Sequence, residues 1–412
     1  MKLSANHLLL TARGTAWLNS FDEPDRPLVR ELTGALSLVS LTEFERSLAN
    51  LILDVASRSG TVALYSAREV GIGGLSFEED SGNSESGLDA TPRGADIGSE
   101  GRTAHIARQI CRNAPEKFVL QPSISQLRER RVERIIVIDD LLGSGSRCTS
   151  YLQALWKYAT VKSWWSYKLI KFSVVAYAAT EDAEKFVRRH HSLPSVHVHR
   201  YCPTISSLSW PPRRRTAARA LCNKYGKRWK LRFPSLGYKK TASLLVFEHG
   251  CPNNVPAIFW AEAERGPDAW HPVFEGRSTS GSVASAFPHE FEADTPVNVL
   301  VAAGQRQLAA SLPAAADRPL SANTLVVLSL LWKGRRRMET LADATGLTAK
   351  ECGELLEACI RSGYATPLRR ITDVGLAEIR GALAAKTLRQ NPVAGPGQDL
   401  YYPRALRDRT SG

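Results

Sequence analysis

Residues 135–147 read Ile-Ile-Val-Ile-Asp-Asp-Leu-Leu-Gly-Ser-Gly-Ser-Arg, and this stretch decides the fold. Its four leading residues are apolar and β-branched, which predicts a buried strand of a parallel sheet. We place that strand at residues 132–138, ending at Asp139, and the following turn of small residues leads into a helix at 146–158. Strand, glycine-containing turn and helix, in this order, form the repeating unit of a doubly wound, mostly parallel α/β sheet.

The acids and the turn together predict a site for a sugar phosphate. Ligands of open parallel sheets lie beyond the carboxyl ends of the strands, where a turn and a helix N-terminus present backbone N–H groups to a phosphate. Asp139 and Asp140 lie one step back from that phosphate and suit the vicinal hydroxyls of a ribose or, through water, a Mg²⁺ ion. The residues expected to bind the phosphate are Gly143, Ser144, Gly145, Ser146 and Arg147.

The segments around this unit continue the alternation of helices and strands. We expect helices at 42–57, 103–112 and 181–189, and strands at 62–65, 169–177, 196–199 and 241–248. These segments assign residues 1–276 to one α/β domain. Residues 78–101 contain Gly, Ser, Asp and Glu and almost nothing apolar, which predicts a mobile acidic loop of the kind that often serves as a lid.

The bulk composition indicates a globular protein with two domains. The chain has 412 residues, of which 43% are hydrophobic. No uncharged apolar run of about 18 residues occurs, and no signal peptide, so we expect a cytoplasmic protein without a membrane partner. The seven cysteines are scattered without a Cys-x-x-Cys pair, which predicts free thiols and no zinc site or disulfide framework.

The net charge of +13 is concentrated in residues 211–240, which contain eleven Lys or Arg and no Asp or Glu. This basic segment indicates an anionic partner, and Tyr225, Trp229 and Phe233 among the charges favour nucleic acid, because aromatic rings stack on bases. A solvated surface helix and loop is the alternative. The nucleic-acid candidates in this segment are Arg213, Arg214, Arg215, Lys227 and Arg228.

The C-terminal residues 321–388 predict a small winged helix-turn-helix domain, between a linker at 277–320 and a tail at 389–412. Helices are expected at 321–334, 338–345, 347–362 and 374–383, with a two-stranded wing at 365–372. The third helix, opened by a capping box of Thr348 and Glu351, would enter the major groove of DNA. The basic residues available to phosphates are Arg335, Arg336, Arg337, Lys350, Arg369 and Arg370.

The charge of this C-terminal domain leaves its partner open. Residues 321–390 contain eleven Lys or Arg and seven Asp or Glu, a net charge of only +4. The polar positions of the third helix are also mixed in charge, since Lys350 lies among Glu351 and Glu354. A protein partner is therefore the alternative to DNA.

Other nucleotide-binding motifs do not match this sequence. A Walker loop requires Gly-Lys-Ser/Thr, and a dinucleotide fingerprint requires a third glycine where Cys148 and Thr149 stand. The histidines at 190, 191, 197 and 199 lack cysteine or carboxylate partners at ligand spacing, so they are interpreted as surface and strand residues. Residues 252–254, Pro-Asn-Asn, are expected to form a turn, with a role in the pocket as the alternative.

Residues 135–147 resemble the signature of the type I phosphoribosyltransferases, and most closely that of the divergent phosphoribosyltransferase-like proteins of bacterial conflict systems. In that group the loop reads apolar-Asp-Asp-x-x-Gly-Ser-Gly, as residues 139–145 do here. The other similar segments, which extend the resemblance over residues 15–275, are 17–21, 25–26, 63–69, 247–254 and 259–260. The resemblance implies a phosphoribosyltransferase-type sheet followed by a winged helix-turn-helix.

The resemblance also implies roles for particular residues. Asp139 and Asp140 would be the catalytic acids that bind the ribose hydroxyls of a phosphoribosyl-diphosphate-like ligand, and Mg²⁺ would be the cofactor. The diphosphate-binding loop would follow an earlier strand, and its candidates are Ser66, Ala67, Arg68 and Glu69. Gly143 and Arg147 stand where catalytic members usually have Thr or Ser, so transferase activity and the acceptor stay open.

The resemblance implies an effector of an antiphage defence system, of the retron type. Its partners would be a nucleic acid, either DNA or a retron RNA/DNA hybrid, and a reverse transcriptase on a separate chain, since no Tyr-x-Asp-Asp occurs here. The alternative is a ligand-sensing, DNA-binding regulator whose phosphoribosyltransferase domain is inactive. An ordinary nucleotide-salvage enzyme is least favoured, because it has no use for the winged helix. The oligomeric state is left open by the sequence.

Overall fold

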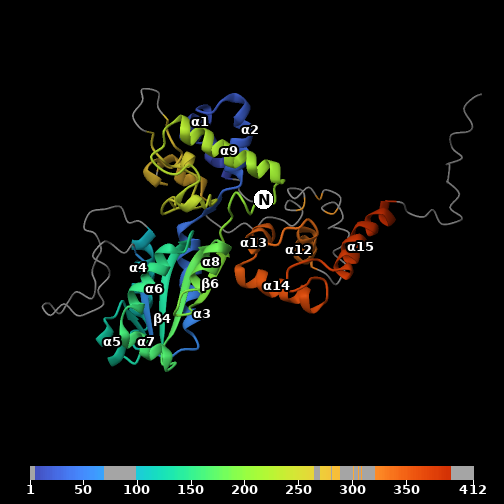
Figure 1. Cartoon of the computed structure of the whole chain (residues 1–412). Helices are drawn as coiled ribbons and strands as arrows, with labels where there is room; N and C mark the ends of the chain where they lie inside the picture. Colours follow the sequence, from blue (N-terminus) through green and yellow to red (C-terminus); the bar gives the residue numbers. More distant parts are fainter. Residues whose placement is uncertain are drawn as a thin grey trace, which may run out of the picture.

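The computed structural model describes residues 5–68, 99–263, 270–279, 281–287, 300, 305, 308 and 321–390. The described residues form three bodies: a helix-covered sheet, a helical cap above one end of it, and a bundle of C-terminal helices beside it (Figure 1). The predicted acidic loop at 78–101 lies outside the described residues up to 98, as do Glu69, the tail beyond 390 and most of the linker.

The main sheet has five strands, all parallel. In order across the sheet they are β3 (Phe118–Leu120), β2 (Val62–Ser66), β4 (Arg134–Leu142), β5 (Lys171–Ala179) and β6 (Ser195–Tyr201). The chain leaves β3 and crosses over β2 to reach β4, so the strand order reverses between β2 and β4. In doubly wound sheets the crevice for ligands lies at the carboxyl ends of the strands at such a switch point.

Helices cover both faces of this sheet, which is why β4 is apolar on both sides. Ile135 and Val137 face one core and Ile136 and Ile138 face the other. One face is covered by α3 (Leu41–Ala56) and α4 (Ser99–Asn113). The other is covered by α5 (Ile124–Glu129), α6 (Ser146–Trp156), α7 (Ala159–Ser166) and α8 (Glu181–Arg188). The predicted doubly wound α/β fold is confirmed.

The cap has its own core, built from both ends of the first 287 residues. Its elements are η1 (Ala5–Leu10), α1 (Ala12–Asn19), η2 (Glu23–Asp25), α2 (Arg26–Gly34), α9 (Pro212–Arg228), η3 (Tyr238–Lys240), η4 (Ala257–Phe259), η5 (Glu275–Arg277) and η6 (Gly281–Ala286). A two-stranded parallel sheet, β1 (Ser37–Val39) with β7 (Leu245–Phe247), joins the cap to the main body. Trp17, fully buried, donates from Nε1 to the carbonyl of Ile258 at 2.8 Å and so ties the two chain segments together.

The C-terminal body is a winged helix-turn-helix. Its helices are α12 (Ala322–Trp332), α13 (Met338–Thr345), α14 (Ala349–Arg361) and α15 (Asp373–Gln390). The capping box of Thr348 and Glu351 opens α14 as predicted. The wing is smaller than predicted, because a single bridge between Ala365 and Ile371 takes the place of two strands.

The structure also corrects boundaries. β4 does not end at Asp139 but continues to Leu142, so the two acids lie inside the strand. The predicted strand at 241–248 shrinks to β7 and belongs to the small sheet. η6 lies beyond the predicted domain boundary at 276 and packs into the cap through Val283 and Ala286. No helix among the described residues is long and apolar enough to cross a membrane, and all seven cysteines are free thiols.

Candidate functional site

Asp139 and Asp140 are buried at the carboxyl end of β4, with 3% and 4% of their surface exposed. The guanidinium of Arg147 bridges them. Its Nη2 lies 2.5 Å from Oδ1 of Asp139 and 2.8 Å from Oδ1 of Asp140. Because unpaired carboxylates are costly to bury, this bridge explains how two adjacent acids are tolerated inside a strand.

His249 is the third polar side chain at the acid pair. It is almost fully enclosed, and its ring is held by Phe247, which stacks on it at 4.8 Å between centroids, and by Phe44. Its Nε2 lies 4.0 Å from Oδ2 of Asp140, and neither ring nitrogen has a hydrogen-bond partner in the described part of the chain. The segment containing His249 was singled out from the sequence, but its position beside the acids was not.

The two acids differ in their proton affinity. Burial raises the pKa of Asp139 to about 8, although the charge of Arg147 opposes the shift. Burial acts in the same direction on Asp140, but Arg147 and His249 outweigh it and hold the pKa of Asp140 below its ordinary value. The two carboxyls therefore differ in how readily they take up a proton, although they are neighbours in the strand. Carboxyl oxygens are suitable partners for neighbouring hydroxyl groups of a sugar.

The turn after β4 is suited to an anion. Gly145 has a left-handed φ of 75° and is the N-cap of α6, and no side chain caps the helix there. In the first turn of α6 the N–H of Ser146 donates to the hydroxyl of Ser144 at 3.4 Å, and a helix N-terminus in general offers its N–H groups to an anion. Thr180, which precedes α8, also contacts this turn, because its Oγ1 donates to the carbonyl of Gly143 at 2.9 Å.

Two residues from the cap complete this turn. The Nζ of Lys239 contacts the hydroxyl of Ser146, which itself accepts from Ser144 at 3.1 Å. Asn254 lies against Gly143 and donates from Nδ2 to Thr241 at 3.1 Å. Lys239 was missed by the sequence analysis, because a lysine 93 residues away in a basic segment has no local signal. Asn254, expected to form a turn, lies close to Gly143 of the predicted phosphate-binding segment, and a role in ligand binding stays a prediction.

Gly143 has a close neighbour that a mutation would reveal. A Cβ at this position would lie 2.3 to 2.5 Å from the side-chain amide atoms of Asn254. We therefore expect Gly143→Ala to displace Asn254 from the turn and to weaken binding of a sugar phosphate by about tenfold, measured by calorimetry. Gly353→Ala, where an added Cβ meets no atom within 4 Å, is the matched control and should bind as the unmodified chain does.

The candidate diphosphate loop is largely committed to other contacts. Ser66 is the last residue of β2, and its hydroxyl lies 2.5 Å from that of Thr103. The N–H of Ala67 donates to the carbonyl of Ile138 at 2.8 Å and so extends the sheet. Arg68 is half-buried at the end of this segment, and Glu69 lies outside the described residues. The hydroxyl of Ser66 and the N–H of Ala67 therefore already have protein partners in this structure.

The comparison with protein families agrees with this geometry. A family model described as PRTase-CE matches residues 15–275, more than half of the chain. The chain belongs to the PRTase-CE family. A second model, described as wHTH-PRTase associated, matches residues 325–408 of the chain. No curated protein and no solved structure was found to match. The predicted phosphoribosyltransferase-like domain and its C-terminal winged helix are confirmed.

The metal expected from the resemblance does not fit the acids of this PRTase-CE domain as they stand. Arg147 already contacts both carboxylates, and its Nη1 lies 3.5 Å from Oε1 of Glu100 on α4. Among the residues that the structure describes, no group of three His, Cys, Asp or Glu side chains is placed to hold a metal ion. The place expected for Mg²⁺ is filled by a guanidinium.

Most cations of the basic segment have partners within the PRTase-CE domain. Arg214 pairs with Glu31, Arg228 lies 2.6 Å from Asp22, and Arg215 donates to the carbonyl of Ser206. The interleaved aromatic residues are largely used as well, since Tyr225 is fully buried and Trp229 stacks on Trp270. In the described part of the chain, the acids pair with Arg214, Lys224 and Arg228, and no acidic partner is found for Arg213, Lys227, Lys230, Arg232 or Lys240, so these five cations are available to a nucleic acid.

The winged helix packs on the PRTase-CE sheet through α13, α14 and the wing, while the polar residues Lys350, Glu351 and Glu354 of α14 stay exposed. The third helix α14 and the preceding α13 pack against β6, the edge strand. Three of the predicted phosphate contacts bind protein groups: Arg335 donates to the carbonyl of Trp210, Arg337 lies 2.7 Å from Asp182, and Arg369 of the wing lies 3.1 Å from Glu181. The candidates that stay exposed are Arg336, Lys350 and Arg370.

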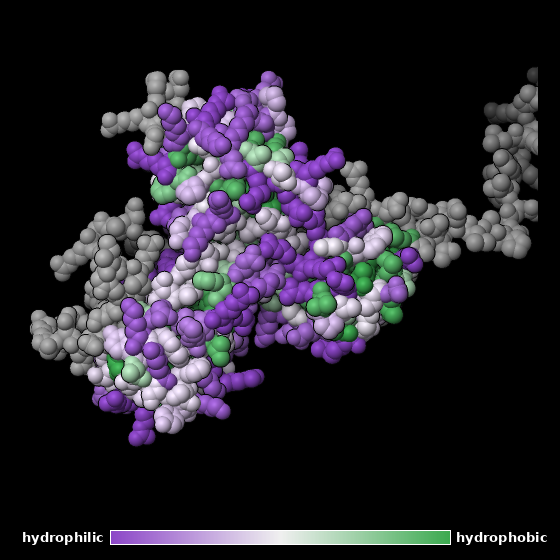
Figure 2. Space-filling view, in the orientation of Figure 1, coloured by the Kyte–Doolittle hydropathy of each residue, from purple (hydrophilic) through white to green (hydrophobic). Residues whose placement is uncertain are grey.

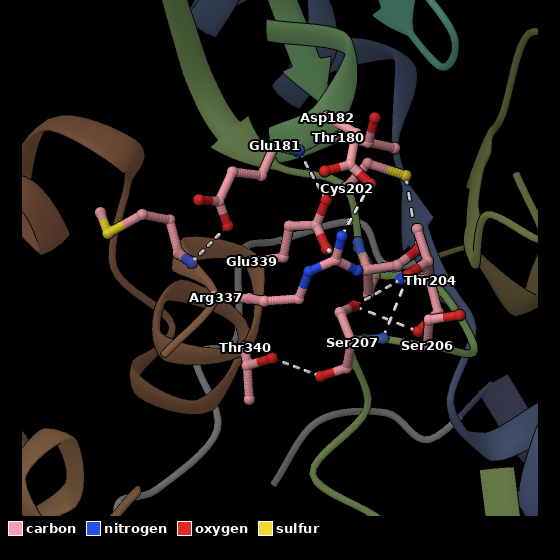
Figure 3. Close-up of polar contacts among 12 residues, drawn as sticks. Thr180, Glu181, Asp182, Cys202, Thr204, Ser206, Ser207, Arg337, Glu339 and Thr340 are labelled. Atoms are coloured by element: carbon pink, nitrogen blue, oxygen red, sulfur yellow. Dashed lines mark hydrogen bonds and ion pairs between the residues drawn. The ribbon is translucent and has the colours of Figure 1, made fainter. Parts of the chain in front are cut away.

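The centre of this interface is a reciprocal capping arrangement between α8 and α13 (Figure 3). Glu339, 1% exposed, accepts from the N–H of Glu181 at 2.6 Å, and Glu181 accepts from the N–H of Met338 at 3.1 Å. Each helix N-terminus is thus capped by a carboxylate from the other body. Hydrophilic residues lie on the surface between the sheet and the C-terminal helices (Figure 2). Glu181 directly follows Thr180, whose hydroxyl donates to the carbonyl of Gly143. The start of α8 therefore contacts both the turn after β4 and the winged helix.

The buried Glu339 makes this interface sensitive to pH. Burial raises its pKa to about 7 from an ordinary 4.5, although the N–H of Glu181 and the charge of Arg337 oppose the shift. When folding raises the pKa of a carboxyl, the folded chain is most stable at a pH low enough to protonate that carboxyl in both the folded and the unfolded state. This stability is lost as the pH rises through the folded-state pKa of about 7. We expect the free energy of unfolding to fall between pH 5 and 8 by up to about 3 kcal/mol.

Urea unfolding at several pH values measures this effect. Glu339→Gln keeps an oxygen that can accept from Glu181 but removes the titration, so its stability should vary less with pH than that of the unmodified chain. Asp182 and Arg337 also face this carboxyl, and both remain in the variant. Identical pH dependence of the two proteins would show that Glu339 is not the titrating group.

Proposed function

We propose that this PRTase-CE chain binds a phosphoribosyl or nucleotide ligand and acts as the effector of a bacterial antiphage defence system of the retron type. One observation supports ligand binding most directly: a buried pair of acids and an uncapped, glycine-containing turn lie together at the carboxyl end of β4, beside the switch point. The acids suit the sugar hydroxyls, and the turn with Lys239 suits the phosphate.

Ligand binding is better supported than group transfer. Arg147 stands at a position where the signature usually has a hydroxyl residue, and it contacts the very acids that would hold the sugar. The residues present therefore favour a binding or sensing role for this site. Transfer to an acceptor remains part of the proposal only if a ligand displaces that guanidinium.

The defence context rests on the resemblance to phosphoribosyltransferase-like proteins of bacterial conflict systems. In this proposal a separate reverse transcriptase and its nucleic acid, DNA or an RNA/DNA hybrid, control the chain in the cytoplasm. Among the predicted nucleic-acid candidates, those without an acidic or backbone-carbonyl partner in the described part of the chain are Arg213, Lys227, Arg336, Lys350 and Arg370.

The alternative, a DNA-binding regulator, needs the third helix and the wing of the C-terminal domain to be accessible. Here α14 packs on β6 and Arg369 binds Glu181, which supports the effector over the regulator. The two differ in a simple measurement. A regulator should bind operator DNA with an affinity that changes with the sugar phosphate, and an effector should protect cells against phage only when its acid pair is intact.

Binding of ribose 5-phosphate, measured by isothermal titration calorimetry on the full chain, tests the proposed site. We expect saturable binding with one ligand per chain. Absence of binding for ribose 5-phosphate, nucleoside monophosphates and phosphoribosyl diphosphate alike would contradict it. Phage-plating assays with the neighbouring genes present then test the biological role.

A further inference from the structure

Arg147 lies at the point where three carboxylates from two other elements meet. Asp139 and Asp140 come from β4, Glu100 comes from α4, and all three lie within 3.5 Å of the guanidinium, which is carried by α6. About a quarter of the Arg147 side chain is exposed, so one edge of it reaches the crevice. Three carboxylates around one point resemble the ligands of a metal ion, but here the guanidinium of Arg147 is the cation between them.

Three of the four oxygens of the acid pair accept a hydrogen bond from a protein group. In Asp139, Oδ1 accepts from Arg147 and from the N–H of Asp140 at 2.9 Å, and Oδ2 accepts from the thiol of Cys148 at 3.2 Å. In Asp140, Oδ1 accepts from Arg147, and Oδ2 faces His249. Mg²⁺ demands near-ideal octahedral coordination by oxygen at about 2.0 to 2.1 Å. Entry of the ion would require these contacts to break.

The candidate diphosphate loop at the end of β2 also argues against a diphosphate ligand. A diphosphate needs several donors and usually a metal ion, because it brings more negative charge than a monophosphate. The hydroxyl of Ser66 and the N–H of Ala67, the first groups of the candidate diphosphate loop, are both engaged elsewhere. The described donors gather instead at the turn near Ser146 and Lys239.

We propose that Arg147 takes the place of the divalent cation at this site, and that the ligand is a ribose 5-monophosphate, free or as part of a nucleoside monophosphate, bound without magnesium. This inference rests on the proposed function and narrows its ligand class. Arg147 neutralises the acids and keeps them oriented toward the sugar, and the turn with Lys239 binds the phosphate. The ligand carries no diphosphate, so no metal is needed to screen one.

Calorimetry with the full chain tests the ligand class. Ribose 5-phosphate is titrated in excess EDTA and in saturating MgCl₂, and phosphoribosyl diphosphate is titrated under the same two conditions. We expect the affinity for ribose 5-phosphate to differ by less than about twofold between the conditions and phosphoribosyl diphosphate to bind no more tightly. A gain of about tenfold or more with magnesium, for either ligand, would overturn the inference while leaving the proposed site intact.

Electron paramagnetic resonance of Mn²⁺ tests the cation site without any sugar. The unmodified chain should bind no more Mn²⁺ than the variant in which Asp139 and Asp140 are both asparagine. Arg147→Gln, which frees the acids, should gain a Mn²⁺ site. Arg102→Gln is the matched control, since Arg102 is similarly exposed and pairs with Glu45 outside the acid pair, and it should gain none.

The two experiments separate the possible failures. Stoichiometric Mn²⁺ binding by the unmodified chain that disappears in the double asparagine variant would overturn the role of Arg147. If no sugar phosphate binds under either condition but the Mn²⁺ result is as expected, the proposed function fails and the role of Arg147 stands. The measurements on the unmodified chain decide both points even if Arg147→Gln does not fold.

Discussion

Replacing both Asp139 and Asp140 by asparagine is expected to lower the affinity for ribose 5-phosphate at least about a hundredfold. The acids are the only pair of charged acceptors at the sugar side of the described site, and hydrogen bonds to charged groups contribute about 1.5 to 3 kcal/mol each. The change also removes the carboxylates that neutralise the enclosed Arg147, which we expect to lower the free energy of unfolding by about 3 kcal/mol.

Folding and binding must therefore be measured separately in this variant. Thermal unfolding gives the temperature below which the double variant is fully folded, and calorimetry is then carried out below that temperature. Glu357→Gln is a matched control, because it removes the carboxylate of an exposed pair with Arg361 that contributes little. Binding by the double variant within about threefold of the unmodified chain would show that the acids do not hold the sugar.

Glu339→Ala is expected to loosen the winged helix. The change removes the carboxylate that accepts from the N–H of Glu181 at the start of α8. It also removes one of the two acidic neighbours of Arg337, so that Asp182 is the one that remains of these two. Loss of a helix cap together with an unsatisfied buried N–H costs about 2 to 3 kcal/mol. Urea unfolding should show this loss, and hydrogen exchange in residues 338–345 should become faster.

Glu339→Gln separates the cap from the charge. This variant keeps an acceptor for Glu181, so its stability at low pH and its exchange rates should stay close to those of the unmodified chain. If Glu339→Ala instead matches the unmodified chain in both measurements, the reciprocal capping of α8 and α13 does not hold the two bodies together. A loosened winged helix should also expose α14, so DNA binding by this variant is worth measuring.

The strand, turn and helix around residues 135–147 were predictable because their signal is local. A β-branched run buried on both faces, small residues in the turn and a helical pattern after it all lie within about two dozen positions. The extension of β4 through Asp139 and Asp140 was not predictable, since acids usually end a buried strand. The guanidinium of Arg147, the second residue of α6, offsets most of the cost of their burial.

Contacts between distant segments account for what was missed at the site. Lys239 and Asn254 reach the turn from the cap, and nothing in their local sequence distinguishes them from a solvated lysine and a turn residue. The pairing of Glu181 with Met338 and Arg369 likewise joins two bodies. Arginines predicted to bind phosphates thus have protein partners, because the sequence alone does not reveal which surface of a winged helix is covered.

The account as a whole depends on sugar and phosphate being bound together at the end of β4. A crystal structure of the chain with ribose 5-phosphate tests this most directly. The account predicts the phosphate at residues 143–146 beside Lys239, with the ribose hydroxyls on Asp139 and Asp140. A phosphate bound elsewhere, or a sugar that leaves both acids in contact only with Arg147, would contradict it.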